Sequence, residues 1–237
     1  MIKQKVERIP TGIQDLDAII GGLVAGRTHL LSGEPGTGKS MFSYHFMYNA
    51  LKHGHTVGLI TTEEPTESIM LHSALLGMPL EKYVNKSLKI VDIASHRAME
   101  AAFATPTGDY LIQSFRDMQQ LIPPGIDCLV IDTITPYILP MNPTMARETA
   151  IELVMNMEAA GLTSLLILDE SVSEHVLMTL AAPMYGHIQL VYQKDPYTGK
   201  PKRCMYIRKL RATTTPTNPL IYNLTDKGIS IQKEIKD

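Results

Sequence analysis

The eight residues GEPGTGKS, from Gly33 to Ser40, constrain the fold more than any other part of the chain. They match the pattern G-x-x-x-x-G-K-[ST], between an apolar run at 28–32 and a stretch with helical spacing. Glycines in such a loop let backbone N–H groups converge on phosphate oxygens, and the following helix start adds partial positive charge. Lys39 can then reach the β- and γ-phosphates, and the hydroxyl of Ser40 can ligate Mg²⁺. The motif predicts a nucleoside triphosphate site between a strand and a helix.

Five apolar runs alternate with longer helical patterns along the chain. Each run is apolar at successive positions, as expected of strands that are buried on both faces of a sheet. Strands that alternate with helices form a parallel sheet with right-handed crossovers. We therefore predict an α/β fold with a mostly parallel central sheet flanked by helices. The expected strands cover approximately residues 28–32, 56–62, 88–93, 127–133 and 163–169.

Four helices are expected between these strands. The first follows the glycine loop and ends at Gly54, and the second begins near Pro65. The third covers about 109–121 and ends before the two prolines of the sequence PPG at 123–125. The fourth is the most clearly marked and covers about 143–160.

Residues typical of helix ends mark this fourth helix. Asn142 can cap its start, Pro143 suits its first position, and Gly161 ends it. Its buried side is predicted to consist of Ala146, Ala150, Leu153, Val154 and Met157.

The pattern changes after about residue 185. HIQLVYQ and RCMYIRKL flank KDPYTGKPK, whose proline and glycine indicate a hairpin turn, and PLIYNL and GISIQ indicate another short pair of strands. We expect antiparallel strands here. The prediction is one domain over 1–237, with a core at about 8–185 and a C-terminal antiparallel hairpin extension at about 186–232.

Composition excludes several classes of protein. The 237 residues carry a net charge of -2, with a pI of about 6.4, so no general basic field indicates nucleic acid. No apolar run approaches the length that spans a bilayer, and the N-terminal MIKQKVERIP is no secretion signal. Cys128 and Cys204 are too far apart to make a metal motif and are a weak case for a disulfide. We expect a soluble cytoplasmic protein without a membrane segment.

Acidic residues follow two of the expected strands. Asp132 ends the run CLVI, where it would hold Mg²⁺ directly or through water. Glu63 and Glu64 end the run at 56–62, at the carboxyl edge of the sheet where ligands bind in open α/β folds. A glutamate there could polarise an attacking water. The alternative is that these two acids simply favour the start of the next helix, and for Glu64 the two interpretations are equally balanced.

The order of several short segments resembles one family. Taken together, they look like a single-domain KaiC-like ATPase of the RecA superfamily, over about residues 8–232. The segments are Ile9–Asp17, Gly21-Gly22-Leu23, the glycine loop, Glu63-Glu64, Asp132, Lys209-Leu210-Arg211 and Leu224–Ile229.

This resemblance implies a RecA-like core that assembles as a ring, usually a hexamer, with Mg²⁺ and ATP between neighbouring subunits. Glu63 matches the catalytic glutamate and Glu64 its companion, and Lys39 would also act in catalysis. ATP binding is assigned by motif and resemblance to Gly33, Glu34, Pro35, Gly36, Thr37, Gly38, Lys39, Ser40, Met41 and Phe42.

The resemblance also implies residues that act across the subunit interface. Lys209 and Arg211 match a basic pair that reaches the γ-phosphate held by the neighbouring subunit, where such a finger neutralises charge in the transition state. The full set expected to contact the neighbour's ATP is Lys209, Leu210, Arg211, Thr213, Thr225 and Asp226.

The chain departs from KaiC itself in three ways. KaiC has two fused domains, whereas this chain has one. The stretch Glu174–Leu180 lacks the adjacent serine and threonine that KaiC phosphorylates, so an autokinase function is not supported. Asp169 and Glu170 are more acidic than expected at the position of a γ-phosphate sensor.

Three functions remain open from the sequence. The first is a slowly hydrolysing ATPase ring whose turnover drives signalling or assembly, with a protein partner. The second is a DNA-dependent ATPase similar to the RadA and RadB recombinases or replicative helicases, because 194–211 is rich in lysine and arginine. We do not favour it, since Tyr197 and Tyr206 are the sole nearby candidates for base stacking. The third is a subunit that senses ATP without hydrolysing it.

Overall fold

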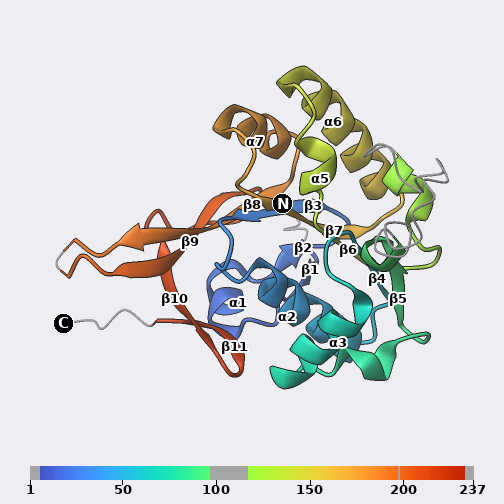
Figure 1. The fold of residues 1–237 in the computed structure, drawn as a ribbon, viewed down its shortest axis with the longest axis horizontal. Coiled ribbons are helices and arrows are strands. Elements are labelled where there is room, and N and C mark those ends of the chain that lie inside the picture. The colour runs from blue at the N-terminus through green and yellow to red at the C-terminus, as the bar shows by residue number, and fades with distance from the viewer. Residues whose placement is uncertain (1–5, 97–116, 197, 233–237) are drawn as a thin grey trace, which may run out of the picture.

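The computed structural model describes residues 6–96, 117–196 and 198–232 (Figure 1). Strands within these residues form one large sheet, and a short pair, β1 (Arg8–Ile9) and β2 (Leu23–Val24), lies beside it. The strands of the large sheet are β3 (Thr28–Gly33), β4 (Val57–Thr61), β5 (Leu88–Asp92), β6 (Cys128–Asp132), β7 (Thr163–Asp169), β8 (Gly186–Lys194), β9 (Pro201–Leu210), β10 (Leu220–Thr225) and β11 (Gly228–Ile231).

Their order across the described part of the sheet is β11-β10-β9-β8-β3-β7-β6-β4-β5. Pairing is parallel from β5 to β8 and antiparallel from β8 to β11. This confirms the predicted α/β class, with a mostly parallel sheet and a C-terminal antiparallel extension. The five strands predicted before residue 170 are found with ends that differ by one residue at most.

The antiparallel strands expected after residue 185 are present as β8 to β11. The other edge of β8 lies parallel to β3, which was not predicted, so β8 also extends the parallel sheet before the chain reverses into β9. The cause is that a helix precedes β8 and returns the chain to the same end of the sheet, as it does for the earlier strands.

Helices cover both faces of the sheet. In Figure 1, α1, α2 and α3 lie on one side, and α5, α6 and α7 on the other. No helix among the described residues is long and apolar enough to cross a membrane. Most of the helix expected at 109–121 lies outside the described residues, and its last five residues form the 3₁₀ helix η2 (Asp117–Leu121). The other elements are α1 (Gln14–Ile20), α2 (Lys39–Lys52), α3 (Thr66–Leu75), η1 (Leu80–Tyr83), α5 (Thr135–Ile138), α6 (Pro143–Ala159) and α7 (Glu174–Ala181).

The signals read from the sequence of α6 are confirmed. The side chain of Asn142 accepts a hydrogen bond from the backbone N–H of Met145 at 3.0 Å, and Pro143 begins the helix. Gly161 follows the helix with a φ of 74°. The five apolar residues predicted to face the core are all buried, namely Ala146, Ala150, Leu153, Val154 and Met157.

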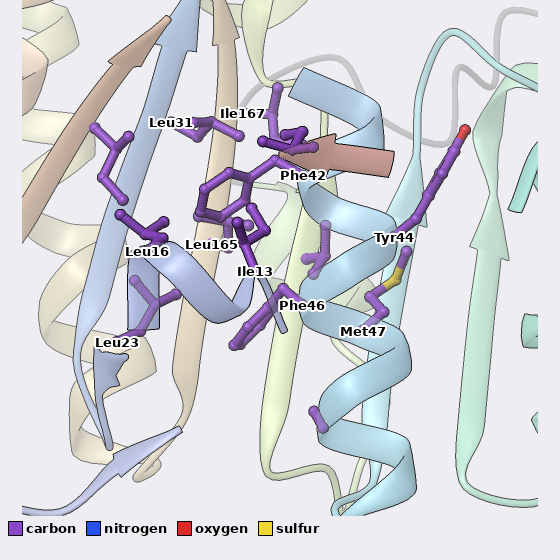
Figure 2. Packing of buried hydrophobic residues seen from close by; sticks show 14 of the residues in the cluster. Ile13, Leu16, Leu23, Leu31, Phe42, Tyr44, Phe46, Met47, Leu165 and Ile167 are labelled. Atoms are coloured by element: carbon purple, nitrogen blue, oxygen red, sulfur yellow. The ribbon is translucent and has the colours of Figure 1, made fainter. Parts of the chain in front are cut away.

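Helix α2 is held against the sheet by its apolar stripe. Phe42 and Phe46 are fully buried, and Figure 2 shows them facing the strands that carry Leu31, Leu165 and Ile167. Because the glycine loop is continuous with the start of α2, this packing fixes the direction in which the first turn of the helix points. The core thus positions the backbone N–H groups that the motif uses.

Candidate nucleotide site

A pocket of about 310 Å³ opens at the carboxyl edge of the parallel strands. This volume lies at the lower end of the range usual for sites of small-molecule ligands. Gly36 and Gly38 have φ values of 76° and 98°, a region that favours glycine. The pocket is lined by Pro35, Gly36, Gly38, Lys39, Ser40, Met41, Glu63, Asp132 and Asp169.

Lys39 is the buried cation of this pocket. Its ammonium donates hydrogen bonds to the carbonyls of Gly33 at 2.9 Å and Glu34 at 3.0 Å. It also lies 2.6 Å from a carboxylate oxygen of Asp169. The two carbonyls hold the side chain along the loop, and the carboxylate occupies the side from which a phosphate would approach.

Asp132 ends β6 at the bottom of the same pocket. Burial raises the pKa of its carboxyl to about 7, and a hydrogen bond from Ser40 opposes that shift. The nearby charges of Glu64 and Asp169 raise this pKa further. Mg²⁺ prefers oxygen ligands and often combines one or two protein oxygens with phosphate oxygens and water. Ser40 and Asp132 fit such a site, because the hydroxyl of Ser40 is hydrogen-bonded to the carboxylate of Asp132 beside the loop.

The two glutamates after β4 occupy different environments. Glu63 is exposed and lines the pocket. Glu64 is held by two side chains, because one carboxylate oxygen lies 2.7 Å from Nδ1 of His72 and the other accepts a hydrogen bond from Tyr44 at 3.1 Å. Burial and the charges of Glu64 and Asp132 raise the pKa of Tyr44. Glu63 is therefore placed to meet a ligand, whereas Glu64 secures the segment that carries it.

A set of threonines at the strand ends was not predicted from the sequence. The hydroxyl of Thr62 donates to the carbonyl of Thr133 at 2.7 Å and accepts from its N–H at 3.0 Å. Thr133 and Thr135 hydroxyls lie 2.8 Å apart, and Thr135 accepts from the N–H of Asp169 at 2.8 Å. The peptide bond between Asp132 and Thr133 is cis. The hydrogen bonds of the threonines tie the ends of β4, β6 and β7 together and so fix the acidic residues relative to one another.

The C-terminal strands contact the glycine loop of the same chain. The hydroxyl of Tyr222 in β10 is buried and donates to the carbonyl of Thr37 at 2.6 Å. The hydroxyl of Tyr192 in β8 donates to the carbonyl of Gly36 at 2.9 Å. The N–H of Tyr192 donates to the carboxylate of Glu34 at 3.0 Å. The loop therefore depends on residues that follow it by more than 150 positions in the chain.

The predicted ATP-binding residues do not all face the pocket. The side chain of Phe42 is fully buried in the core and does not line the pocket, so any contact it makes with ATP is limited to its backbone. The hydroxyl of Thr37 is turned into the loop, where it donates to the carbonyl of Glu34 at 2.7 Å. Met41 does line the pocket, as predicted.

The basic pair near the end of β9 lies away from this pocket. The ammonium of Lys209 donates to the carbonyl of Ala182 at 2.8 Å, and Arg211 is exposed directly after the strand. Leu210 is buried in the core and Thr213 is half-buried. None of these four residues lines the pocket of its own chain.

Thr225 and Asp226 lie at the C-terminal end of β10. They follow Leu224, and a Cβ on Gly38 would lie only 2.8 Å from a methyl carbon of Leu224. The end of β10 is thus packed beside the phosphate loop of its own chain. Neither Thr225 nor Asp226 lines the pocket of its own chain, and their contact with the neighbour's ATP stays a prediction.

A glycine loop at a helix start, a half-buried carboxylate at a strand end and a glutamate that lines the same pocket define a P-loop nucleotide-binding protein of α/β fold. A family model described as an ATPase, KaiC, matches residues 9–236, and the chain therefore belongs to the KaiC ATPase family.

Individual relatives agree with this assignment. The chain is 29% identical over 242 residues to a UPF0273 protein from Aeropyrum pernix, with 95% of this chain and 94% of that protein covered. It is 27% identical over 242 residues to the circadian clock oscillator protein KaiC of Parasynechococcus marenigrum, which covers 97% of this chain but 45% of that longer protein. A crystal structure of a KaiC-like protein from Pyrococcus horikoshii matches with a TM-score of 0.73 at 26% identity, covering 97% of this chain and 100% of that one.

Proposed function

We propose that this protein binds Mg·ATP in the pocket beside Lys39 and hydrolyses it slowly, as one subunit of a homo-oligomeric ring. The observation that carries the proposal is the convergence of Lys39, Asp132 and Glu63 on one pocket. A hexamer in the cytoplasm, with turnover coupled to signalling or assembly through a protein partner, is the form that the family suggests.

Each residue has a defined task in this proposal. Lys39 leaves Asp169 and neutralises the β- and γ-phosphates, while Ser40 and Asp132 hold Mg²⁺ when it is bound. The metal would neutralise charge on the phosphate oxygens. Glu63 orients the attacking water, because its carboxylate borders the pocket and is exposed.

The neighbouring subunit would supply Lys209 and Arg211. Support for this comes from two observations: neither residue lines the pocket of its own chain, and Arg211 is exposed, which leaves its guanidinium available to another chain. Leu210 and Thr213 would accompany them. Thr225 and Asp226 would complete this set on the neighbour's side, as the family resemblance implies.

The test is phosphate release from Mg·ATP by the wild type, Glu63→Gln and Glu64→Gln. Loss of a general base costs about 100-fold or more in rate, so we expect this loss for Glu63→Gln with ATP binding retained. Glu64→Gln is the matched control and should keep a larger share of the activity. Tight ATP binding without turnover in the wild type would instead support a sensor.

The alternative of a DNA-dependent ATPase gains little from the described residues. The guanidinium of Arg208 lies 4.1 Å from the ring centre of Tyr206, so the chain itself already covers one face of this ring. Tyr197 lies outside the described residues. Stimulation of turnover by single-stranded DNA at low salt would revive this alternative.

A further inference from the structure

Arg8 connects the N-terminal strand to the turn that follows β9. One guanidinium nitrogen donates to the carbonyls of Ile20 and Gly22, each at 3.1 Å. The other donates to the carbonyl of Ala212 at 3.0 Å and to the hydroxyl of Thr213 at 2.7 Å. The half-buried side chain of Arg8 therefore holds a turn in which Ala212 follows Arg8 by 204 residues.

The turn that Arg8 holds is conformationally unusual. Ala212 has a φ of 53°, a left-handed conformation that residues with a Cβ seldom adopt. The hydroxyl of Thr213 donates to the carbonyl of Arg211 at 3.2 Å while it accepts from Arg8. The N–H of Arg211 donates to the carbonyl of Tyr185. Arg8 thus completes a set of bonds that fixes the backbone on both sides of Ala212.

We propose that Arg8 is a positioning residue for the finger residue Arg211. By fixing the turn at Ala212 and Thr213, it sets the direction in which the exposed Arg211 leaves β9 toward the neighbouring subunit. This inference rests on the proposed function, in which Arg211 acts across an interface. All four acceptors of Arg8 are uncharged oxygens, so its role in the turn is directional and does not neutralise an acid.

Lysine could not replace Arg8 in this role. The planar guanidinium presents donors in a fixed fork, so one side chain reaches the Ile20–Gly22 segment and the Ala212–Thr213 turn at once. An ammonium on a flexible stem offers a point charge without that geometry. Arg8→Lys therefore separates the geometry of the contact from its charge.

The test uses rings that contain two kinds of subunit, coexpressed with different tags and purified through both. Lys39→Ala subunits lack a working pocket but keep Arg211, whereas Arg211→Ala subunits keep a working pocket but lack the finger residue. In a mixed ring, activity returns at each interface where Arg211 of a Lys39→Ala subunit faces the pocket of an Arg211→Ala subunit. If Arg8 positions the finger residue, rings made only of Arg8→Gln or only of Arg8→Lys subunits should lose kcat to a similar degree. Mixing either variant with Lys39→Ala subunits should restore activity.

The expected loss of kcat for each Arg8 variant alone is about 10- to 100-fold, because misplacement of a catalytic group by about 1 Å can cost about 100-fold. The Kd for a fluorescent ATP analogue should change far less, since the variant's own pocket is intact. Arg147→Gln is the matched control, because Arg147 is exposed on α6 and should leave kcat unchanged.

The outcomes separate this inference from the proposed function. If Arg211→Ala is not rescued, the interface role of the finger is wrong. If Arg211→Ala is rescued but the Arg8 variants remain inactive in the mixed rings, Arg8 supports the fold of its own pocket and the inference is overturned. Full activity of Arg8→Lys alone would also overturn it, because charge would then suffice.

Discussion

The ammonium of Lys39 lies 2.6 Å from the carboxylate of Asp169, at the end of β7 and inside the pocket. A phosphate that binds Lys39 must compete with this carboxylate, which also repels it. Asp169→Asn should therefore tighten binding of ATP about 3- to 10-fold, a change of about 0.6–1.4 kcal/mol, which is the size of a typical net hydrogen-bond contribution. Titration with a fluorescent ATP analogue, with and without EDTA, measures this change.

Glu148→Gln, on the exposed side of α6, serves as the control for a lost negative charge. If Asp169→Asn bound the ATP analogue more weakly than wild type, and only when Mg²⁺ was present, the prediction would be contradicted and Asp169 would be assigned to the metal.

The raised pKa of Asp132 predicts a pH-dependent stability. Burial moves this pKa from 3.8 to about 7, so between these values the folded protein holds a proton that the unfolded chain has lost. The contribution of Asp132 to stability therefore falls as the pH rises from about 4 to about 7. Asp132→Asn removes this dependence. In EDTA, the melting temperature of the variant minus that of the wild type should therefore be larger at pH 8 than at pH 5. A difference that does not vary with pH would contradict the assignment.

The buried hydroxyl of Tyr222 predicts that a C-terminal residue controls the phosphate loop. Tyr222→Phe leaves the carbonyl of Thr37 without its partner, which should cost about 1–2 kcal/mol in unfolding free energy. Because Thr37 belongs to the loop, ATP affinity should fall as well. Urea unfolding and ATP titration measure the two effects. Tyr83→Phe, whose ring packs against Tyr48 on the other side of α2, is the matched control; equal effects of both variants would contradict the prediction.

A close contact between Gly228 and His45 predicts a strongly destabilising substitution. Gly228 has a φ of 100°, and a Cβ on it would lie 1.9 Å from Nε2 of His45. Gly228→Ala should therefore lower the free energy of unfolding by about 2–4 kcal/mol, combining backbone strain with a displaced side chain.

Gly54→Ala is the control for backbone strain alone, because Gly54 has a φ of 86° with no atom within 4 Å of a Cβ position. It should cost about 1 kcal/mol. Thermal or urea unfolding compares the two variants, and similar losses would show that the contact with His45 is unimportant.

Local signals explain which features could be predicted from the sequence. The glycine loop and the cap of α6 depend on residues next to one another, so their patterns were sufficient. Asp132 and Glu63 were found because parallel strands bring their ends to one edge. The short elements α1, β1 and β2 were missed, since runs of two to seven residues carry little periodicity.

Contacts between distant segments could not be predicted in the same way. The acidic character of Asp169 was visible, but its ion pair with Lys39 requires β3 and β7 to be neighbours in the sheet. The bonds of Tyr192 and Tyr222 to the loop depend on the path of the C-terminal strands. The packing of Leu224 beside Gly38 follows from the same path.

The contacts of Tyr192 and Tyr222 with the glycine loop also bear on how the protein is made. The loop is synthesised at residues 33–40, but its partners in β8 and β10 follow it by more than 150 residues. Domains generally gain their structure as units, and contacts distant in sequence form late because a long segment must be closed first. The phosphate loop can therefore reach its final form only after β10 has left the ribosome, and a nascent chain that stops short of β10 would lack a settled nucleotide site.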